Sequence, residues 1–185
     1  MRIIAGQYRS RPLRALPGSD TRPTSDRLRE TLFNVLAAAR TLEGTVWWDL
    51  FAGTGAVGLE ALSRGAAMVY FIEQSRTAVQ VIRCNLQSLG IKQGGLIIER
   101  GAAAAVHQLD QPPDFVFLDP PYRLHEAYRE LLDLLGASSL LKPETIVIAE
   151  HDKRHDPGES HGRLERYRLL KQGDAALSFY AVEQP

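Results

Sequence analysis

The feature that most constrains this chain is the repeated alternation of short apolar runs with amphipathic stretches. The runs are rich in β-branched and aromatic residues, and most end at a glycine or an acidic residue. The expected strands cover residues 45–52, 67–73, 95–100, 114–119 and 145–150. Between them, apolar residues recur at helical spacing. Strands that alternate with helices predict an α/β fold, with a mostly parallel sheet covered on both faces.

The two ends of the chain depart from this alternation. Residues 164–182 contain two strand-like runs around Gly173 and Asp174 with no helix between them, which predicts an antiparallel hairpin at one sheet edge. Residues 2–16 are typical of a short hairpin turning near residues 9–12, and Thr24 or Ser25 is the expected cap of a helix that ends at about Ala39. We therefore expect a single domain over residues 1–185, with an N-terminal hairpin-plus-helix extension (1–40) and a seven-stranded core (41–185).

The charge of the chain is unevenly distributed, although the formal net charge is zero. Residues 1–40 contain eight arginines and only three acidic residues. A basic N-terminal part favours contact with a polyanion, although a solvated arginine-rich surface has the same composition. The chain has a single cysteine, and neither a long apolar run nor the apolar stretch of a secretory signal. These features predict a cytoplasmic protein without a membrane segment.

A glycine-rich loop, DLFAGTGAVG (residues 49–58), connects the first expected strand of the core to its helix. Its spacing is Gly53-x-Gly55-x-x-Gly58, and Glu73 ends the next strand twenty residues after Gly53. This pattern predicts a nucleoside-bearing cofactor held by backbone N–H groups and by a carboxylate on the ribose. Dinucleotide enzymes share it. Asp49, just before the glycines, instead favours a cofactor that carries positive charge.

A second stretch, DPPY (residues 119–122), ends the fourth strand of the core. In a doubly wound sheet this strand lies beside the first strand, next to the glycine loop. The Asp119 carboxylate and the Pro120 carbonyl provide two acceptors, Pro121 stiffens the corner, and Tyr122 provides a ring for stacking. This set suits a planar group with an exocyclic amine, because accepting both N–H bonds directs the nitrogen lone pair at an electrophile. A plain strand end with a proline turn is the structural alternative.

With these motifs, the chain resembles the class I S-adenosylmethionine-dependent methyltransferases, and in particular the RsmD family. The stretches MRIIAGQYRSRPL, TRPTSDRLRETLFNVL, DLFAGTGAVGLEALSRGA and FLDPPY carry the resemblance over nearly the whole chain. The family methylates the 2-amino group of a guanine in 16S ribosomal RNA, guanine 966 by convention. The resemblance implies a Rossmann-like fold, S-adenosylmethionine as cofactor, and a small ribosomal subunit, assembled or assembling, as partner.

The resemblance also implies roles for particular residues. The cofactor would lie against Asp49, Phe51, Ala52, Gly53, Thr54, Gly55, Glu73, Gln74, Gly101, Ala102 and Asp119. The catalytic residues would be Asp119, Pro120, Pro121 and Tyr122. RNA would contact Arg9, Arg11, Arg22, Thr24, Arg27 and Tyr122. One departure is Ala102, which stands where an acidic residue is common in the wider class, so adenine would be held by backbone groups and apolar packing.

Other readings remain open at this point. A DNA or RNA adenine 6-amino methyltransferase would use the same DPPY stretch, although this chain has no room for a separate DNA-recognition domain. A non-catalytic RNA-binding module and an NAD-dependent oxidoreductase are further alternatives. His151, His155 and His161 are expected in a solvated loop, and we expect no metal site. Trp47 and Trp48 should face opposite sides of the sheet as core residues. We expect a monomer.

Overall fold

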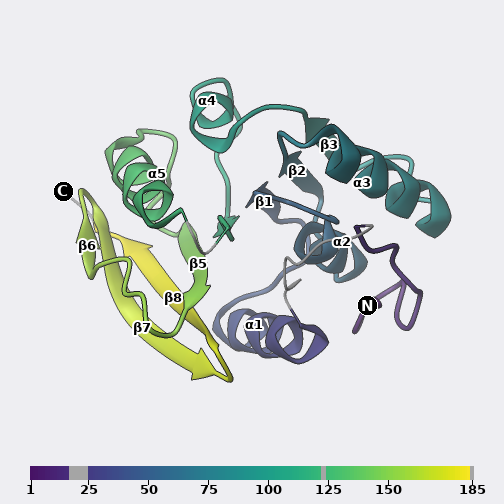
Figure 1. Cartoon of the computed structure of the whole chain (residues 1–185), viewed down its shortest axis with the longest axis horizontal. Helices are drawn as coiled ribbons and strands as arrows, with labels where there is room; N and C mark the ends of the chain where they lie inside the picture. Colours follow the sequence, from purple (N-terminus) through teal and green to yellow (C-terminus); the bar gives the residue numbers. More distant parts are fainter. Residues whose placement is uncertain (17–24, 122–123, 184–185) are drawn as a thin grey trace.

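The computed structural model describes residues 1–16, 25–121 and 124–183, in which helices pack on both sides of one eight-stranded sheet (Figure 1). The parallel strands are β1 (Val46–Leu50), β2 (Met68–Ile72), β3 (Gly95–Ile98), β4 (Phe115–Leu118) and β5 (Ile146–Asp152). The antiparallel strands are β6 (Ser160–His161), β7 (Leu164–Gln172) and β8 (Ala175–Val182). The helices are α1 (Asp26–Ala39), α2 (Ala56–Ser63), α3 (Arg76–Leu89), α4 (Ala102–Val106) and α5 (His125–Ala137).

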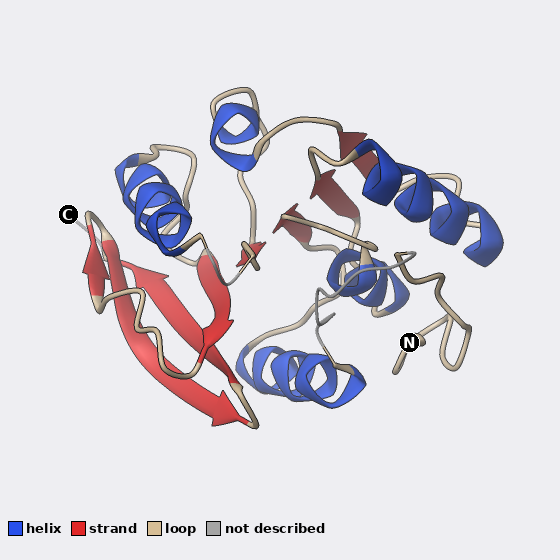
Figure 2. Cartoon of the chain, in the orientation of Figure 1, coloured by secondary structure: helices blue, strands red, loops and turns tan. Residues whose placement is uncertain are grey.

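The strand order is β3-β2-β1-β4-β5-β8-β7-β6, which confirms the Rossmann-like fold. The chain moves outward from β1 to β3 and then returns to place β4 beside β1, so the order reverses between these two strands. Ligands bind at the carboxyl ends of the strands at such a reversal. Figure 2 shows the antiparallel strands gathered at the end of the sheet far from the N-terminus. The sheet has eight strands instead of the expected seven because the two-residue β6 pairs with the start of β7.

Two apolar clusters fill the two faces of the sheet. Helices α1, α2 and α3 cover one face together with Ile3 and Leu13 from the N-terminal segment, and α4 and α5 cover the other face. Trp47 and Trp48 are fully buried in different clusters, as their adjacent positions on β1 predict. A strand that is buried on both faces loses the alternating polar pattern, and this explains the continuous apolar runs in the sequence.

The N-terminal segment differs in detail from the expected hairpin. Residues Arg2 and Pro12 form an isolated antiparallel bridge, and the Ile3 and Ser10 N–H groups donate to the Arg11 and Ile3 carbonyls. The chain therefore reverses within residues 4–9, earlier than the expected turn near residues 9–12. Helix α1 begins after Ser25, whose hydroxyl accepts the Leu28 N–H, as expected for a capping serine. The division of the chain at residue 40 stays a prediction.

In the described part of the chain, no helix combines the length and apolar character needed to cross a membrane.

Candidate active site

The register of β1, β2, β4 and β5 brings the carboxyl ends of these strands level with one another. Acidic residues stand at or just beyond these ends: Asp49 in β1, Glu73 after β2, Asp119 after β4 and Glu150 in β5. Four carboxyl groups therefore gather at this edge of the sheet, at the reversal of strand order. Such an edge suits a ligand that brings positive charge.

The glycine loop adopts a backbone that brings it tightly round from β1 into α2. Phe51, Gly53 and Gly55 all have positive φ angles, of 62°, 55° and 78°. Positive φ is uncommon for a residue with a side chain, so Phe51 marks a constrained position at the end of β1. Gly58 serves close packing instead, because a Cβ at this position would lie 2.4 Å from the Phe71 ring. The loop thus combines a tight turn with close approach of α2 to the sheet, as the glycine spacing predicts.

Asp49 lies beneath this loop and is 1% exposed. Its Oδ2 accepts the Gly58 N–H at 2.9 Å. Burial raises the pKa of Asp49 to about 7, a change that the Gly58 hydrogen bond opposes and the charge of Glu73 increases. A buried carboxyl of this kind is stabilised as the anion when a cation lies beside it. The buried Asp49 carboxyl group therefore fits a cofactor with an ammonium or sulfonium group.

The residues predicted on the ribose and adenine side also come together. The Glu73 carboxylate accepts the Gly53 N–H at 2.9 Å and the Ser75 N–H at 2.7 Å, one on each oxygen. Each carboxylate oxygen has a further lone pair, so Glu73 keeps acceptor capacity for two hydroxyl groups. A Cβ added at Gly101 would lie 3.5 Å from the Gln74 side-chain oxygen, which shows how close these two residues are. Ala102 is buried and begins α4 in the apolar cluster.

The described part of the DPPY stretch lies beside the glycine loop. The Asp119 N–H reaches the Leu50 carbonyl at 3.4 Å, so Asp119 extends the pairing of β4 with β1. Its side chain is half-buried. Burial raises the pKa of Asp119 well above the usual value of 3.8, and the nearby charges of Glu150 and Asp49 raise it further. Tyr122 lies outside the described residues.

The Pro120 carbonyl has a partner that the sequence did not indicate. The Tyr128 hydroxyl on α5 lies 3.1 Å from the Pro120 carbonyl oxygen and 2.9 Å from the Glu150 carbonyl oxygen. The Tyr128 hydroxyl therefore occupies one acceptor position of the Pro120 carbonyl. A carbonyl oxygen has two lone pairs, so it keeps one for a ligand N–H. Tyr128 also ties the DPPY stretch to β5, which fixes the direction of the Pro120 carbonyl.

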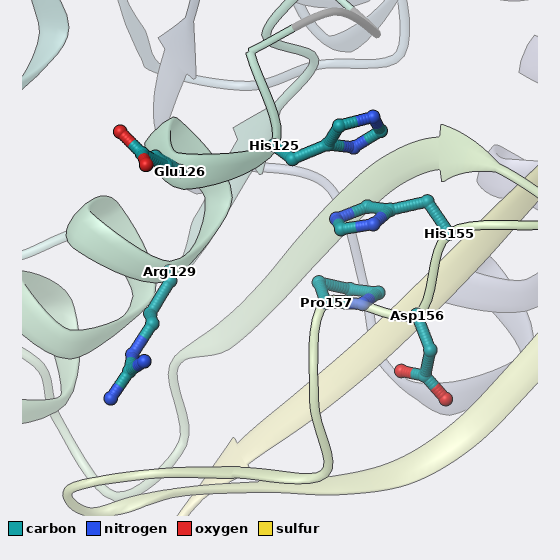
Figure 3. A pocket seen from close by; sticks show the side chains of 6 residues that line it. All are labelled: His125, Glu126, Arg129, His155, Asp156 and Pro157. Atoms are coloured by element: carbon teal, nitrogen blue, oxygen red, sulfur yellow. The ribbon is translucent and has the colours of Figure 1, made fainter.

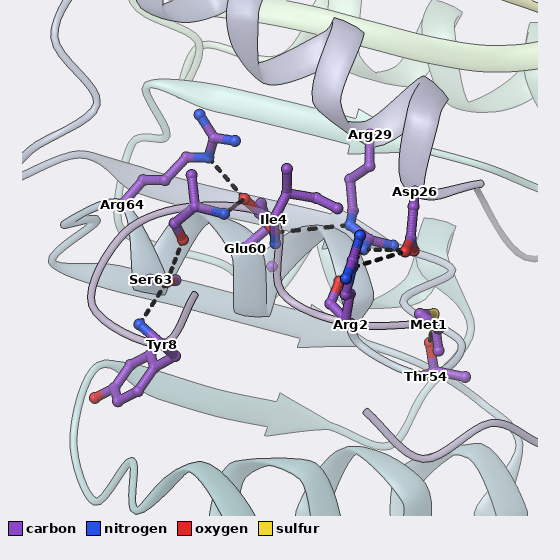
Figure 4. A network of polar contacts seen from close by, with 12 residues as sticks. Met1, Arg2, Ile4, Tyr8, Asp26, Arg29, Thr54, Glu60, Ser63 and Arg64 are labelled. Carbon is purple, nitrogen blue, oxygen red and sulfur yellow. Dashed lines mark hydrogen bonds and ion pairs between the residues drawn. The ribbon is translucent and has the colours of Figure 1, made fainter. Parts of the chain in front are cut away.

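The N-terminal segment is held against α1 and α2 by a buried acid, Glu60 (Figure 4). Its two oxygens accept the Ile4 and Ala5 N–H groups at 2.8 and 3.0 Å. The guanidinium groups of Arg64 and Arg29 lie 2.8 and 3.8 Å from the same carboxylate. The basic N-terminal part is thus anchored to the Rossmann-like core through a largely buried network of ion pairs.

A second link joins the N-terminal segment to the glycine loop. The Asn85 side chain is fully buried on α3. Its oxygen accepts the Arg14 N–H at 2.8 Å, and its amide donates to the Arg14 carbonyl at 3.3 Å and to the Thr54 carbonyl at 3.0 Å. One side chain therefore positions both the glycine loop and the N-terminal segment at Arg14.

The predicted RNA-contacting residues have different surroundings. Arg9 and Arg27 are exposed, and Arg11 donates to the Ser88 carbonyl at 2.7 Å, at the end of α3. Arg22 and Thr24, like Tyr122, lie outside the described residues. Their contacts with RNA stay predictions.

The expectation of a solvated histidine loop is wrong. His151 and His161 are buried, and their ring nitrogens lie 2.9 Å from the Ser178 hydroxyl and 2.7 Å from the Asp133 carboxylate. His155 faces His125 across a small pocket after the DPPY stretch, with ring centroids 4.2 Å apart (Figure 3). The error arises because β5 runs two residues past Glu150, which carries His151 into the sheet. In the described part of the chain, no three His, Cys, Asp or Glu side chains gather as a metal ion requires.

Sequence reasoning missed several polar side chains that shape the site. Asn85 and Glu60 each stand among apolar residues on the buried face of a helix, which is a detectable signal. In the sequence, Glu150 ends the apolar run of residues 145–150, as Glu73 ends the run of residues 67–73. The pattern that singled out Glu73 and Asp119 therefore pointed to Glu150 as well. For Tyr128 no signal exists, since tyrosine on an amphipathic helix is common.

A Rossmann-like sheet with a glycine loop, acids at its strand ends and an Asp-Pro-Pro corner defines a class I methyltransferase fold. A family model described as "Conserved hypothetical protein 95" matches residues 1–181. The ribosomal RNA small subunit methyltransferase D of Escherichia coli K12 is 39% identical over 99% of this chain and 90% of its own. The Haemophilus influenzae protein of the same name is 37% identical over 100% of this chain and 93% of its own.

A solved structure, that of Escherichia coli yhhF, has a TM-score of 0.86 and 35% sequence identity. The match covers 99% of this chain and 98% of that chain. Together with the family model and the curated relatives, it shows that this chain belongs to the RsmD family of methyltransferases.

Proposed function

We propose that this protein transfers a methyl group from S-adenosylmethionine to the 2-amino group of a guanine in 16S ribosomal RNA. By family convention, the target is guanine 966. The observation that carries the proposal is that two groups of residues lie side by side at the ends of the paired strands β1 and β4. One is the glycine loop with the buried Asp49 beneath it, and the other is the Asp119 carboxylate with the Pro120 carbonyl. The names of the two curated relatives support ribosomal RNA as the substrate.

The residues on the cofactor side suit S-adenosylmethionine in charge and shape. Asp49 would face its ammonium end, Glu73 would accept hydrogen bonds from the ribose hydroxyls, and Ala102 would pack against adenine. When bound, this cofactor supplies an electrophilic methyl group on a sulfonium, and the sulfur is the leaving group, as a neutral thioether. The positive charge of such a ligand would stabilise the Asp49 anion, which burial disfavours in the absence of a cation.

The residues on the base side act on the amine. A guanine 2-amino nitrogen is a weak nucleophile, since its lone pair is delocalised into the ring. The Asp119 carboxylate accepts one N–H and the Pro120 carbonyl accepts the other, which draws the nitrogen toward tetrahedral geometry and directs its lone pair at the methyl group. These hydrogen bonds strengthen as positive charge develops on the nitrogen, so they lower the barrier and do more than bind the base.

The basic N-terminal part suits the phosphates of RNA. Arg9 and Arg27 are exposed, as a contact with a polyanion requires. The target guanine must be unpaired or flipped out, because its amine is not accessible to this corner inside a stable duplex. The proposed partner is the small ribosomal subunit, assembled or assembling, and the proposed form of the enzyme is a monomer.

The test is transfer of labelled methyl from S-adenosylmethionine to small subunits from cells that lack this protein, beside naked 16S RNA and DNA. We expect label in the RNA of the subunit, released as 2-methylguanosine. Asp119→Ala should lower transfer by at least ~100-fold, the scale for loss of a charged transition-state contact, while cofactor binding persists. Exposed Asp110→Ala is the matched control. Label in 6-methyladenine would refute the guanine assignment, and RNA binding without any transfer would indicate a non-catalytic module.

A further inference from the structure

Glu150 is a buried acidic residue of the site, and it has no role in the reaction described so far. It is 2% exposed and stands in β5, next to the DPPY stretch. The register pairs Leu118 with Ala149, so the next pair along β4 and β5 is Asp119 and Glu150. Adjacent strands lie about 4.8 Å apart, which brings the two acids into the same small volume.

The two side chains point to the same face of the sheet. Phe117 and Ile148 both belong to the apolar cluster under α1, α2 and α3. Asp119 and Glu150 stand two residues further along the same strands, and side chains at this spacing share a face. His151, the next residue on β5, points to the opposite face, where it contacts Ser178. The Glu150 side chain therefore lies beside the Asp119 side chain on the same face of the sheet.

The Tyr128 hydroxyl lies between the two backbones at this level and shares its one proton between two carbonyl oxygens. The Tyr128 hydroxyl lies within hydrogen-bond distance of both the Pro120 and the Glu150 carbonyl oxygens. Pro120 directly follows Asp119 in the chain, and Glu150 lies opposite Asp119 on the neighbouring strand. The spacing of the pair is thus set by the sheet register on one side and by α5 on the other. Among the described residues, the charges that act on Asp119 come from Asp49 on β1 and Glu150 on β5.

This arrangement matters because methylation of the amine leaves a surplus proton. As the N–CH3 bond forms, the S–CH3 bond breaks and its electron pair stays on sulfur. The nitrogen then carries a positive charge until one N–H proton departs. Asp119 already accepts one of these N–H bonds in the proposed complex, so it is the nearest group to receive the proton.

We propose that Glu150 makes Asp119 the proton acceptor of the reaction, as the buried partner in a pair of neighbouring carboxylates. Two neighbouring carboxylates cannot both stay ionised without cost, so the charge of Glu150 increases the affinity of Asp119 for a proton. The proton moves from the nitrogen to Asp119, an O–H bond forms, and the methylated base becomes neutral. The proton passes to solvent when the products leave. Glu150 acts through Asp119 and is a positioning residue.

The proposal rests on the proposed function, and the experiment separates the two. Single-turnover methyl transfer is measured from pH 5 to pH 9 for the wild type, Glu150→Gln and Glu150→Asp. Removing the charge in E150Q should move the acid limb of the profile to lower pH by about one unit and lower the plateau several-fold, because a weaker base accepts the proton. E150D keeps the charge and should keep the limb near its wild-type position.

Matched controls make the outcomes decisive. Glu144→Gln, at an exposed position just before β5, should leave the profile unchanged. Cofactor affinity and urea midpoints report whether each variant is folded, and Glu150→Ala replaces E150Q if the buried amide prevents folding. An active wild type with an unshifted limb in the folded charge-removing variant overturns the role of Glu150 alone. A wild type that methylates no guanine overturns the proposed function instead.

Discussion

The raised pKa of Asp49 predicts an unusual pH dependence of stability that one substitution removes. An acid whose pKa is higher in the folded state than in the unfolded state contributes stability while it is protonated. This contribution is complete below about pH 4 and is lost as the pH rises through the folded-state value of about 7. Asp49→Asn has no such dependence, and its amide oxygen can still accept the Gly58 N–H.

The magnitude follows from the two pKa values. Each unit corresponds to about 1.4 kcal/mol, so from pH 5 to pH 8 the asparagine variant should gain ~3 kcal/mol of unfolding free energy relative to the wild type. The assay is urea unfolding of both proteins at the two pH values without cofactor. The effect is the change in unfolding free energy between the two pH values in D49N minus the same change in the wild type, so the contributions of other titrating groups cancel.

A matched substitution reports the background. Glu130→Gln removes a carboxyl from an exposed position of α5 and should show no comparable change between the two pH values. S-Adenosylmethionine should narrow the gap at pH 8, because its positive charge stabilises the Asp49 anion. If the stability difference between D49N and the wild type is the same at pH 5 and pH 8, the reasoning about burial and charge at this position is refuted.

Three further substitutions test how the site is held. In Gly6→Ala, the new Cβ would lie 1.8 Å from the Ser63 carbonyl oxygen, and Gly44→Ala is a matched control with similar φ and nothing within 4 Å. Urea unfolding should show the first variant at least ~2 kcal/mol less stable than the second. Asn85→Ala should cost ~1–3 kcal/mol and weaken cofactor binding in a titration, because it leaves a buried loop carbonyl without its donor. Tyr128→Phe should lower the single-turnover rate by ~3–10-fold with unchanged cofactor affinity, since the loss of one hydrogen bond frees the base-side carbonyl. A wild-type rate in Y128F would show that this carbonyl needs no support.

The topology and much of the site could be predicted because their signals are local. An apolar run that is buried on both faces, followed by glycines or an acid, identifies a parallel strand and its carboxyl end. Asp49, Glu73 and Asp119 were therefore visible in the sequence, and the fold that brings them together follows from the alternation of strands and helices. Helix α1 was equally clear, since Ser25 stands directly before an apolar repeat.

The remaining features depend on contacts between distant parts of the chain. The Ile4 and Ala5 N–H groups could satisfy many acceptors, and only docking on α2 assigns them to Glu60. Tyr128 reaches the Pro120 carbonyl because α5 folds back over β4, a direction that helical spacing does not specify. His151 was misplaced because β5 continues to Asp152, and His161 was misplaced because it lies in the two-residue strand β6. Strand ends are poorly marked where polar residues are buried by a neighbouring hairpin.

The central claim, that this chain methylates one guanine amine in ribosomal RNA, is tested most directly in cells. 16S RNA is isolated from cells with and without this protein, and its modified nucleosides are mapped by mass spectrometry. The account predicts that a single 2-methylguanosine disappears without the protein and returns with the wild type, but not with Asp119→Ala. An unchanged set of methylated guanines in the 16S RNA of cells without the protein would contradict it.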